Sequence, residues 1–574
     1  MLYSALALLG LLLATDASPV LAAPSGLVSK RTSPTESPPV IDLGYARVQG
    51  YLNSTDSQYW WKGIRYASAD RFQAPRTPAT HTAAVYNATA YGPTCFQAAE
   101  GGATLLGKPP VANFTGINQS EDCLYLNINA PAGACEGSNL PVLVWIHGGG
   151  YAAGSAAQGS DFAEFITNAG GDIVVVTVQY RLGPFGFLAG QETADFGALN
   201  AGLLDQQFSL QWVQQHISKF GGDPSHVTIW GESAGAGSVL NQILANGGNT
   251  PKALGLKQPL FQAAIGSSVF LPTQVAYNDP IAETIYQNLV DFVGCGNSSQ
   301  SSFACLQGKD AATVAAAALN LSKAAPTGYW TYVPVVEGQG GFLQERGSLL
   351  LAKGSKNLNG LKFLGINNQD EGYIFTDPSI RNDTTTDATQ LGTQFNQVLA
   401  GLFPLFTAAE IQSVAAQYPI SDAPVTGNTF SRISNIIADS TFVCPTYWTA
   451  EAFGSSAWKG IFDYGAATHG SDVGWYQGMI WNGKHSVSAE TSFAGSFEGF
   501  IQTYDPNNNP ATDINPHWST FDSGEQLLFN TTTRDTLSQA DPSIVDTASI
   551  KVYGSTQTAK CDFWRGNISV HAGL

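Results

Sequence analysis

Short apolar runs rich in β-branched residues alternate along the chain with segments of helical periodicity. The clearest runs occupy residues 141–147, 172–180 and 227–229, and each is typical of a buried strand. Between the last two, residues 199–220 carry apolar side chains at alternating spacings of four and three, broken only at Gln206, which predicts a helix. Strands that alternate with helices predict an α/β fold with a large, mainly parallel central sheet and helices on both faces.

The pattern changes on either side of this region. Residues 44–84 indicate short antiparallel strands, and residues 121–129 alternate apolar and polar side chains as a strand does. The segments 275–325 and 380–440 are rich in Ala, Gln, Thr and Asn, which predicts helices and loops that roof a pocket. No linker or internal repeat divides the chain, so a single domain is expected. Further strand-like runs occupy residues 261–269, 332–336, 361–366 and 459–464.

A serine lies where the run 227–229 passes into a helical pattern. Gly231-Glu-Ser-Ala-Gly235 follows the run, and Leu240, Ile243 and Leu244 continue at helical spacing. The five-residue motif alone is as compatible with a structural turn as with catalysis. The strand before it and the helix after it favour a nucleophile, because flanking glycines permit a strained turn that exposes Ser233 beside the N–H groups of a helix N-terminus.

Three glycines, Gly148 to Gly150, directly follow the run 141–147. They fit neither of the glycine patterns that cradle phosphate groups, so a phosphate loop is not predicted. A plain turn is one alternative. We favour a loop of backbone donors, because glycine lets main-chain N–H groups approach a substrate oxygen closely.

A serine hydroxyl needs a base within hydrogen-bond reach and an acid that orients the base, and in sheets of this kind both follow the serine, acid first. His469 follows the strand-like run 459–464 in a loop, which favours it as the base. Asp370 and Glu371 follow the run 361–366, and the residue pattern does not distinguish between them as the acid. The other late histidines are His485, His517 and His571.

Composition narrows the classes of partner. The chain of 574 residues carries a net charge of −18, which argues against nucleic acid and anionic membranes as partners because both need a basic surface. The seven cysteines suggest three disulfides and one free thiol in an oxidising compartment, with connectivity left open. Oligomeric state is not indicated.

The N-terminal sequence predicts secretion. Residues 2–14 form an apolar run too short to span a bilayer, and small residues follow at Ala22 and Ala23, which indicates a signal peptide over residues 1–23 rather than a buried helix. Lys30-Arg31 precedes a Pro/Ser-rich segment and predicts a propeptide over residues 24–31, followed by one domain over 32–574. No apolar tail follows Cys561, so stable membrane insertion is not expected. Glycosylation candidates are Asn53, Asn87, Asn113, Asn118, Asn297, Asn320, Asn382, Asn530 and Asn567.

Taken together, these motifs resemble the type-B carboxylesterase/lipase family of α/β-hydrolases, which includes the cholinesterases and several secreted fungal lipases. The resemblance runs in the family's order from about residue 40 to residue 565. The matching stretches are residues 121–127, 142–151, 200–215, 221–224, 227–238, 332–338, 368–372, 469–470 and 561–564.

The resemblance implies an α/β-hydrolase fold, an acyl-enzyme mechanism and no metal or organic cofactor. Ser233 is implied as the nucleophile, His469 as general base and acid, and Glu371 as the orienting carboxylate. Glu232 matches a buried acid beside the nucleophile. The implied oxyanion-hole donors are the N–H groups of Gly149, Gly150 and Ala234. The implied disulfides are Cys95–Cys123, Cys295–Cys305 and Cys444–Cys561, which leaves Cys135 unpaired.

The expected function is therefore that of a secreted serine carboxylic-ester hydrolase. Asn113 stands where cholinesterases carry a cation-binding tryptophan, so a quaternary ammonium site is not expected. The segment between Cys95 and Cys123 is short and polar for a lipase lid, with only Leu105, Leu106 and Val111 suited to that role. We therefore expect short-to-medium acyl esters as substrates. The alternatives are a triacylglycerol or sterol-ester lipase and a catalytically silent cholinesterase-like binding module.

Overall fold

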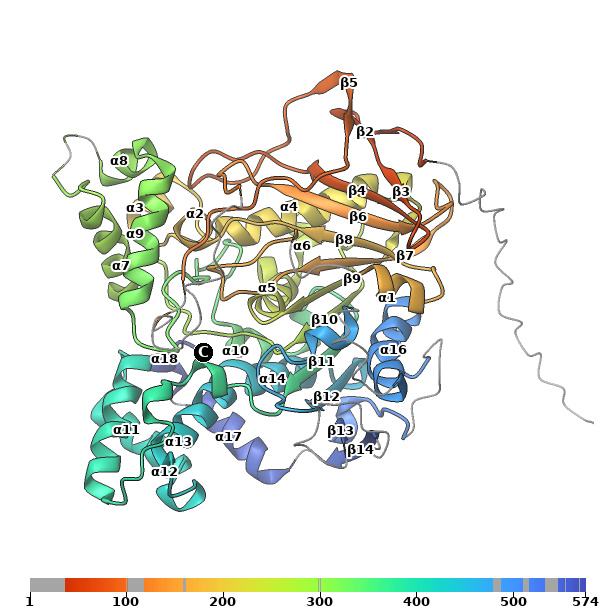
Figure 1. The fold of residues 1–574 in the computed structure, drawn as a ribbon. Helices are drawn as coiled ribbons and strands as arrows, with labels where there is room; N and C mark the ends of the chain where they lie inside the picture. The colour runs from red at the N-terminus through yellow and green to blue at the C-terminus, as the bar shows by residue number, and fades with distance from the viewer. Residues whose placement is uncertain are drawn as a thin grey trace, which may run out of the picture.

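The computed structural model describes residues 37–99, 101, 118–157, 162–297, 299, 301–477, 487–508, 516–531, 546–552, 554–566 and 568–574 (Figure 1). Several expectations lie outside these residues. They are the signal peptide, the propeptide, Leu105, Leu106, Val111, Asn113, His485 and Asn567.

Within the described residues, the main sheet has eleven strands, and the run from β8 to β13 is parallel throughout. Antiparallel strands flank this run at both edges. In spatial order the strands are β14 (Asp546–Val552), β13 (Glu525–Thr531), β12 (Ala457–Asp463), β11 (Lys362–Asn368), β10 (Ala263–Ser267), β9 (Gly222–Glu232), β7 (Leu140–Ile146), β8 (Val174–Val178), β6 (Tyr125–Pro131), β4 (Gln58–Arg65) and β3 (Tyr51–Asn53). A smaller sheet contains β1 (Ile41–Asp42), β2 (Ala46–Gln49) and β5 (His81–Asn87).

The central strands are apolar on both faces because each face packs on a separate core. Along β7, Val142, Val144 and Ile146 enter one core, whereas Leu143 and Trp145 enter the other. This alternation is the two-residue period of a strand, and burial of both faces explains the continuous apolar runs in the sequence.

Helices cover both faces, as predicted. The helices α4 (Ala201–His216), α5 (Ala234–Gly248) and α14 (Cys444–Phe453) pack on the first core, and α1 (Ala163–Asn168) and α16 (Val487–Thr503) pack on the second. The predicted helix over 199–220 is confirmed as α4 and a 3₁₀ turn, Ile217–Phe220, that directly follows it. Gln206, the one position that interrupts the apolar spacing of this helix, has a buried amide. Its Nε2 donates to Ser238 Oγ of α5 at 2.9 Å.

The two excursions from the sheet are helical, as expected, and lie at the left of Figure 1. The first contains α7 (Pro280–Phe292), α8 (Ser302–Gly308) and α9 (Ala311–Ala324), and the second contains α11 (Ala388–Leu402), α12 (Ala408–Gln417) and α13 (Asn428–Ile437). The remaining α-helices are α2 (Gly183–Phe187), α3 (Gln191–Phe196), α6 (Thr250–Leu254), α10 (Gly347–Leu351), α15 (Val473–Tyr476), α17 (Ser555–Arg565) and α18 (Ser569–Ala572).

The prediction of a strand over residues 332–336 is wrong. Only Val336 forms a β-bridge, to Ala276, and Pro334 offers no N–H to a ladder. The backbone of Val335 is instead bonded to a side chain: its N–H donates to Asn200 Oδ1 and its carbonyl accepts from Asn200 Nδ2. The strands β13 and β14 were not predicted.

The structure contains the three disulfides implied by the family resemblance, Cys95–Cys123, Cys295–Cys305 and Cys444–Cys561. Cys135 is free and exposed. The third bridge joins the start of α14 to α17, so it fastens the last described helices to the first core.

Removal of the Cys444–Cys561 bridge should destabilise the protein more than removal of Cys295–Cys305. The bridges close sequence separations of 117 and 10 residues, for which unfolded-chain entropy gives roughly 5 and roughly 3 kcal/mol. Urea unfolding of Cys444→Ala/Cys561→Ala and Cys295→Ala/Cys305→Ala double variants measures the two losses. An equal or smaller loss for the first variant would contradict the prediction.

Candidate active site

Ser233 lies on the sharp turn between β9 and α5, at the carboxyl edge of the parallel sheet. Its φ of 58° and ψ of −127° are a conformation that residues with a side chain rarely adopt. Two flanking glycines make the turn possible. A Cβ on Gly231 would come within 2.3 Å of the Gly235 backbone, and a Cβ on Gly235 would come within 2.0 Å of the Ile146 carbonyl oxygen.

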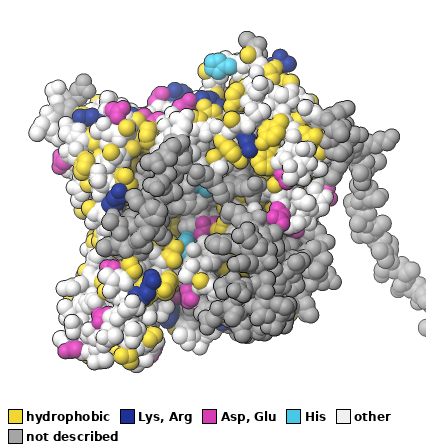
Figure 2. All heavy atoms as spheres, viewed as in Figure 1, with side chains coloured by type: hydrophobic (Ala, Val, Ile, Leu, Met, Phe, Trp, Pro, Cys, Tyr) yellow, Lys and Arg dark blue, Asp and Glu magenta, His cyan; other side chains and the backbone are white. Residues whose placement is uncertain are grey.

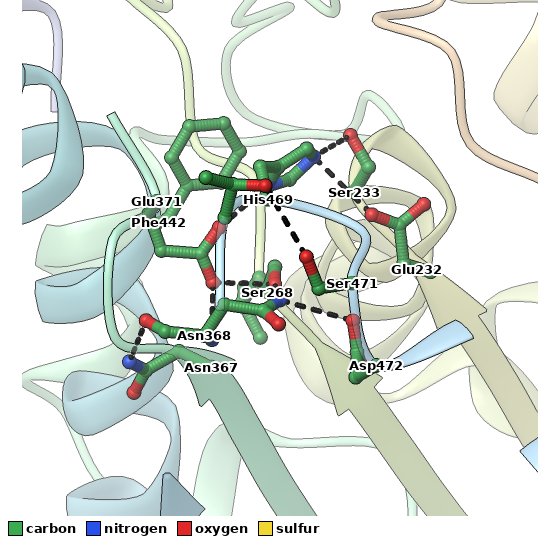
Figure 3. A network of polar contacts seen from close by, with 12 residues as sticks. Glu232, Ser233, Ser268, Asn367, Asn368, Glu371, Phe442, His469, Ser471 and Asp472 are labelled. Carbon is green, nitrogen blue, oxygen red and sulfur yellow. Dashed lines mark hydrogen bonds and ion pairs between the residues drawn. The ribbon is translucent and has the colours of Figure 1, made fainter. Parts of the chain in front are cut away.

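His469 joins this serine to a carboxylate on a third segment of the chain (Figure 3). Its Nε2 lies 2.8 Å from Ser233 Oγ, and its Nδ1 lies 2.5 Å from Glu371 Oε2. The Nδ1–H group donates a hydrogen bond to the carboxylate. In the neutral imidazole, Nε2 is then free of a proton and can accept the one from serine. Of the two adjacent acids, Glu371 is fully buried and faces His469, whereas the backbone of Asp370 forms a β-bridge with Thr468.

Neighbouring polar groups hold the buried Glu371 carboxylate in place. Its Oε1 accepts from Ser268 Oγ and from the Asn368 N–H, both at 2.6 Å. Asn368 Nδ2 donates in turn to Asp472 Oδ1 at 2.9 Å. Burial raises the pKa of the Asp472 carboxyl to about 6. Sequence reasoning missed Ser268, Asn368 and Asp472, although Asn368 and Asp472 lie within three residues of the predicted acid and base.

Two carboxylates set the protonation of His469. Glu232 Oε1 lies 3.2 Å from Nε2, so this ring nitrogen faces both a hydroxyl and a carboxylate. Burial alone would lower the pKa of His469, but the charges of Glu371 and Glu232 outweigh it and raise the pKa from 6.5 to about 9. The imidazolium form is therefore strongly stabilised at this position.

The glycine loop after β7 lies directly against the serine. A Cβ on Gly148 would be 2.6 Å from the Glu232 carbonyl oxygen and 3.0 Å from Ser233 Cβ. Gly149 and Gly150 have φ values of 105° and 63°. Ala234 is the first residue of α5, where helix N–H groups have no partner within the helix. Among the described residues, no hydrogen-bond acceptor is found for the N–H groups of Gly149, Gly150 and Ala234.

Aromatic side chains form a wall beside His469. The rings of Phe442 and Phe375 lie 4.4 and 4.9 Å from the imidazole, centroid to centroid. Trp330 contacts Phe375 at 5.3 Å and Phe270 at 4.8 Å. Phe442 belongs to a π-helix, Ala438–Val443, and sequence reasoning identified none of these four residues.

The other late histidines that the structure describes lie elsewhere. His571 pairs with Glu410, with 2.7 Å between Nδ1 and Oε1, and His517 is exposed. The described residues contain no group of three or more His, Cys, Asp or Glu side chains placed to hold a metal ion. In space-filling form, histidine and acidic atoms appear near the centre of the viewed face, among hydrophobic side chains (Figure 2).

This geometry suits acyl transfer. A hydroxyl bonded to a carboxylate-oriented imidazole can be deprotonated as it attacks a carbonyl carbon. Unpartnered N–H groups beside it can stabilise the oxyanion that forms.

Several known proteins that this chain resembles are named lipases or esterases. A model of the carboxylesterase family matches residues 37–564. The chain is similar to Secreted lipase 1 of Botryotinia fuckeliana, at 34% identity over 438 residues that cover 72% of this chain and 73% of that protein. It is also similar to Lipase 4 of Diutina rugosa, at 33% identity over 68% of this chain and 71% of that protein.

Solved structures of esterases are also similar to this chain. Aspergillus niger EstA superposes with a TM-score of 0.77 at 27% identity, covering 94% of this chain and 99% of that one. A PNB esterase gives a TM-score of 0.70 at 26% identity, covering 92% and 100%. These likenesses confirm the predicted α/β-hydrolase fold and the activity of a carboxylic-ester hydrolase. The chain belongs to the carboxylesterase family.

Proposed function

We propose that the protein is a secreted serine esterase whose catalytic triad is Ser233, His469 and Glu371. The observation that carries the proposal is the unbroken hydrogen-bond chain from Ser233 Oγ through both ring nitrogens of His469 to a buried carboxylate. This chain supplies the base that a serine hydroxyl needs and the acid that orients the base.

The proposed reaction has two stages, acylation of the serine and hydrolysis of the acyl-enzyme. Ser233 Oγ attacks the ester carbonyl while His469 Nε2 takes its proton, and the N–H groups of Gly149, Gly150 and Ala234 bind the tetrahedral oxyanion. His469 then returns the proton to the leaving alcohol. Water attacks the acyl-enzyme in a second round of the same proton transfers and releases the carboxylic acid.

Glu232 adds to the stabilisation of the imidazolium that forms in each tetrahedral step. Its carboxylate approaches Nε2, the nitrogen that carries the transferred proton. The same carboxylate also stabilises the protonated resting base, so its contribution to the rate depends on pH.

We favour short-to-medium acyl esters as substrates. Phe270, Trp330, Phe375 and Phe442 provide an apolar wall beside His469. The second candidate is a lipase of the same mechanism, which the names of the relatives favour.

Secretion is also a proposal. Relatives are named secreted lipases, from Botryotinia fuckeliana and Gibberella zeae. Among the helices that the structure describes, none has the length and apolar character needed to cross a bilayer. Five described glycosylation candidates are exposed, whereas Asn53 and Asn530 are half-buried. The exposed candidates are Asn87, Asn118, Asn297, Asn320 and Asn382.

Ser233→Ala should lower kcat for p-nitrophenyl butyrate by at least ~10³-fold, because the nucleophile is lost. A fluorophosphonate should label the wild-type protein at one serine and leave the variant unlabelled, as mass spectrometry can establish. Ser225→Ala, at an exposed serine of β9, is the matched control and should keep full activity. Near-normal turnover by Ser233→Ala would exclude the proposed triad.

The activity of the free enzyme should rise with pH along a limb set by His469. The base must be neutral to accept a proton, so kcat/KM for an uncharged ester should increase below the raised pKa of about 9 and level off above it. Glu232→Gln removes one of the charges that raise this pKa and should move the limb to lower pH. A wild-type limb at or below 6.5, or a limb that Glu232→Gln leaves in place, would contradict the assignment.

A chain-length series of p-nitrophenyl esters separates the two candidate substrates. An esterase with this aromatic wall should saturate below the solubility limit of the substrate and prefer short acyl chains. Ser233→Ala at each chain length gives the background rate. A rise in rate at the solubility limit, with preference for long chains, would establish the lipase alternative instead.

A further inference from the structure

His147 is a buried histidine that the proposed reaction leaves without a role. It ends the run before the glycine loop, and only 5% of its surface is exposed. Its Nδ1 lies 2.9 Å from the carbonyl oxygen of Gly148. A carbonyl oxygen can only accept, so Nδ1 carries the proton and donates this hydrogen bond.

The ring is fixed from several sides. Tyr180 stacks on it with 4.5 Å between centroids and 20° between planes, and the Tyr180 hydroxyl donates to the His147 carbonyl at 2.8 Å. A Cβ on Gly154 would lie 2.3 Å from Nδ1, so the absence of a side chain there makes room for the imidazole. Burial lowers the pKa of His147 to about 4, which keeps the ring neutral and Nδ1 protonated at neutral pH.

The hydrogen bond to Gly148 fixes the direction of the next N–H group. In a trans peptide, the C=O of one residue and the N–H of the following residue lie in one plane and point in opposite directions. A donor that holds the Gly148 carbonyl on one side therefore turns the Gly149 N–H to the other side. Glycine peptides rotate easily, so this direction needs such a restraint.

The next peptide is restrained by different means. The Gly149 carbonyl accepts from the N–H groups of Ala152 and Ala153, at 3.0 and 2.9 Å, and this pair of bonds orients the Gly150 N–H. The backbone of the loop thus fixes the second donor by itself. Within the described residues, the donor to the Gly148 carbonyl is the imidazole of His147.

We propose that His147 is a positioning residue that aims the Gly149 N–H at the oxyanion. The proposal rests on the proposed function, because it assigns the Gly149 N–H to the oxyanion hole. It differs from a packing role in one respect: it concerns a group that is used only when charge develops on the substrate oxygen.

Two substitutions of similar size, His147→Asn and His147→Leu, test the hydrogen bond. The first places an amide N–H near the position of Nδ1, whereas the second fills the site without a donor. His147→Leu should lower kcat about 10²-fold with KM within about twofold of wild type, the effect of losing one oxyanion donor. His147→Asn should recover at least about tenfold of that loss, because its amide can still hold the Gly148 carbonyl.

Binding of a transition-state mimic distinguishes positioning from packing. A trifluoromethyl ketone forms a tetrahedral oxyanion on the serine. Its inhibition constant should therefore rise in His147→Leu by about the factor by which kcat falls. Thermal unfolding checks that the variants fold. Should His147→Leu not fold, His147→Gln replaces it, because glutamine carries its N–H one bond further out and misses the Gly148 carbonyl.

The outcomes separate this proposal from the proposed function. Suppose that Ser233→Ala loses activity, while the variant without the donor keeps its kcat and its affinity for the inhibitor. This result would overturn the role of His147 and leave the proposed function in place. Equal activities of His147→Asn and of the variant without the donor, His147→Leu or His147→Gln, would also overturn the role of His147. Full activity in Ser233→Ala would overturn the proposed function itself.

Discussion

The fully buried carboxylate of Glu371 is the constraint on which the site depends. Removing a carboxylate from water costs several kcal/mol unless hydrogen bonds and opposite charge offset it. Here both oxygens are engaged: Oε2 by His469, and Oε1 by Ser268 and the Asn368 backbone. These partners come from the ends of β10, β11 and the loop after β12, so the register of three neighbouring parallel strands sets the position of one charge. The histidine is then held by the carboxylate, and the serine by the histidine.

The charge that positions His469 also determines when it can act. An acid pair around one imidazole stabilises the imidazolium of each tetrahedral step, and it equally stabilises the imidazolium of the resting enzyme. The first effect speeds the reaction, whereas the second removes the base at low pH. Glu232 contributes to both effects, because its carboxylate faces His469 Nε2. This nitrogen must be unprotonated before the reaction and protonated during it. An enzyme with this arrangement is therefore best suited to alkaline surroundings, in which the base is neutral.

The parts of the fold that the sequence revealed are those governed by local patterns. The helix over 199–220 and the strand 227–229 follow from periodicity, the glycines around Ser233 follow from the lack of room for neighbouring Cβ atoms, and the structure contains all three. The run 332–336 has the composition of a strand, but its backbone is bonded by the distant Asn200, a contact between residues 135 apart that no local pattern reports. The same holds for Ser268, whose hydroxyl meets Glu371 across 103 residues. Asp370 and Glu371 could not be separated by pattern for a similar reason, since only the fold decides which of two adjacent side chains is buried.

The chemistry and the specificity of the site come from different kinds of structure. Ser233, Glu371, His469 and the glycine loop all follow sheet strands, and their positions are tied to the ladder and to close backbone contacts. Three of the four wall residues come from other kinds of segment: Trp330 from a loop, Phe375 from a 3₁₀ turn and Phe442 from a π-helix, a form often found at functional sites. None of these three segments belongs to the strand ladder that sets the position of Glu371. In the proposed mechanism, a change in the wall would therefore alter the acyl group that is accepted without moving the buried carboxylate.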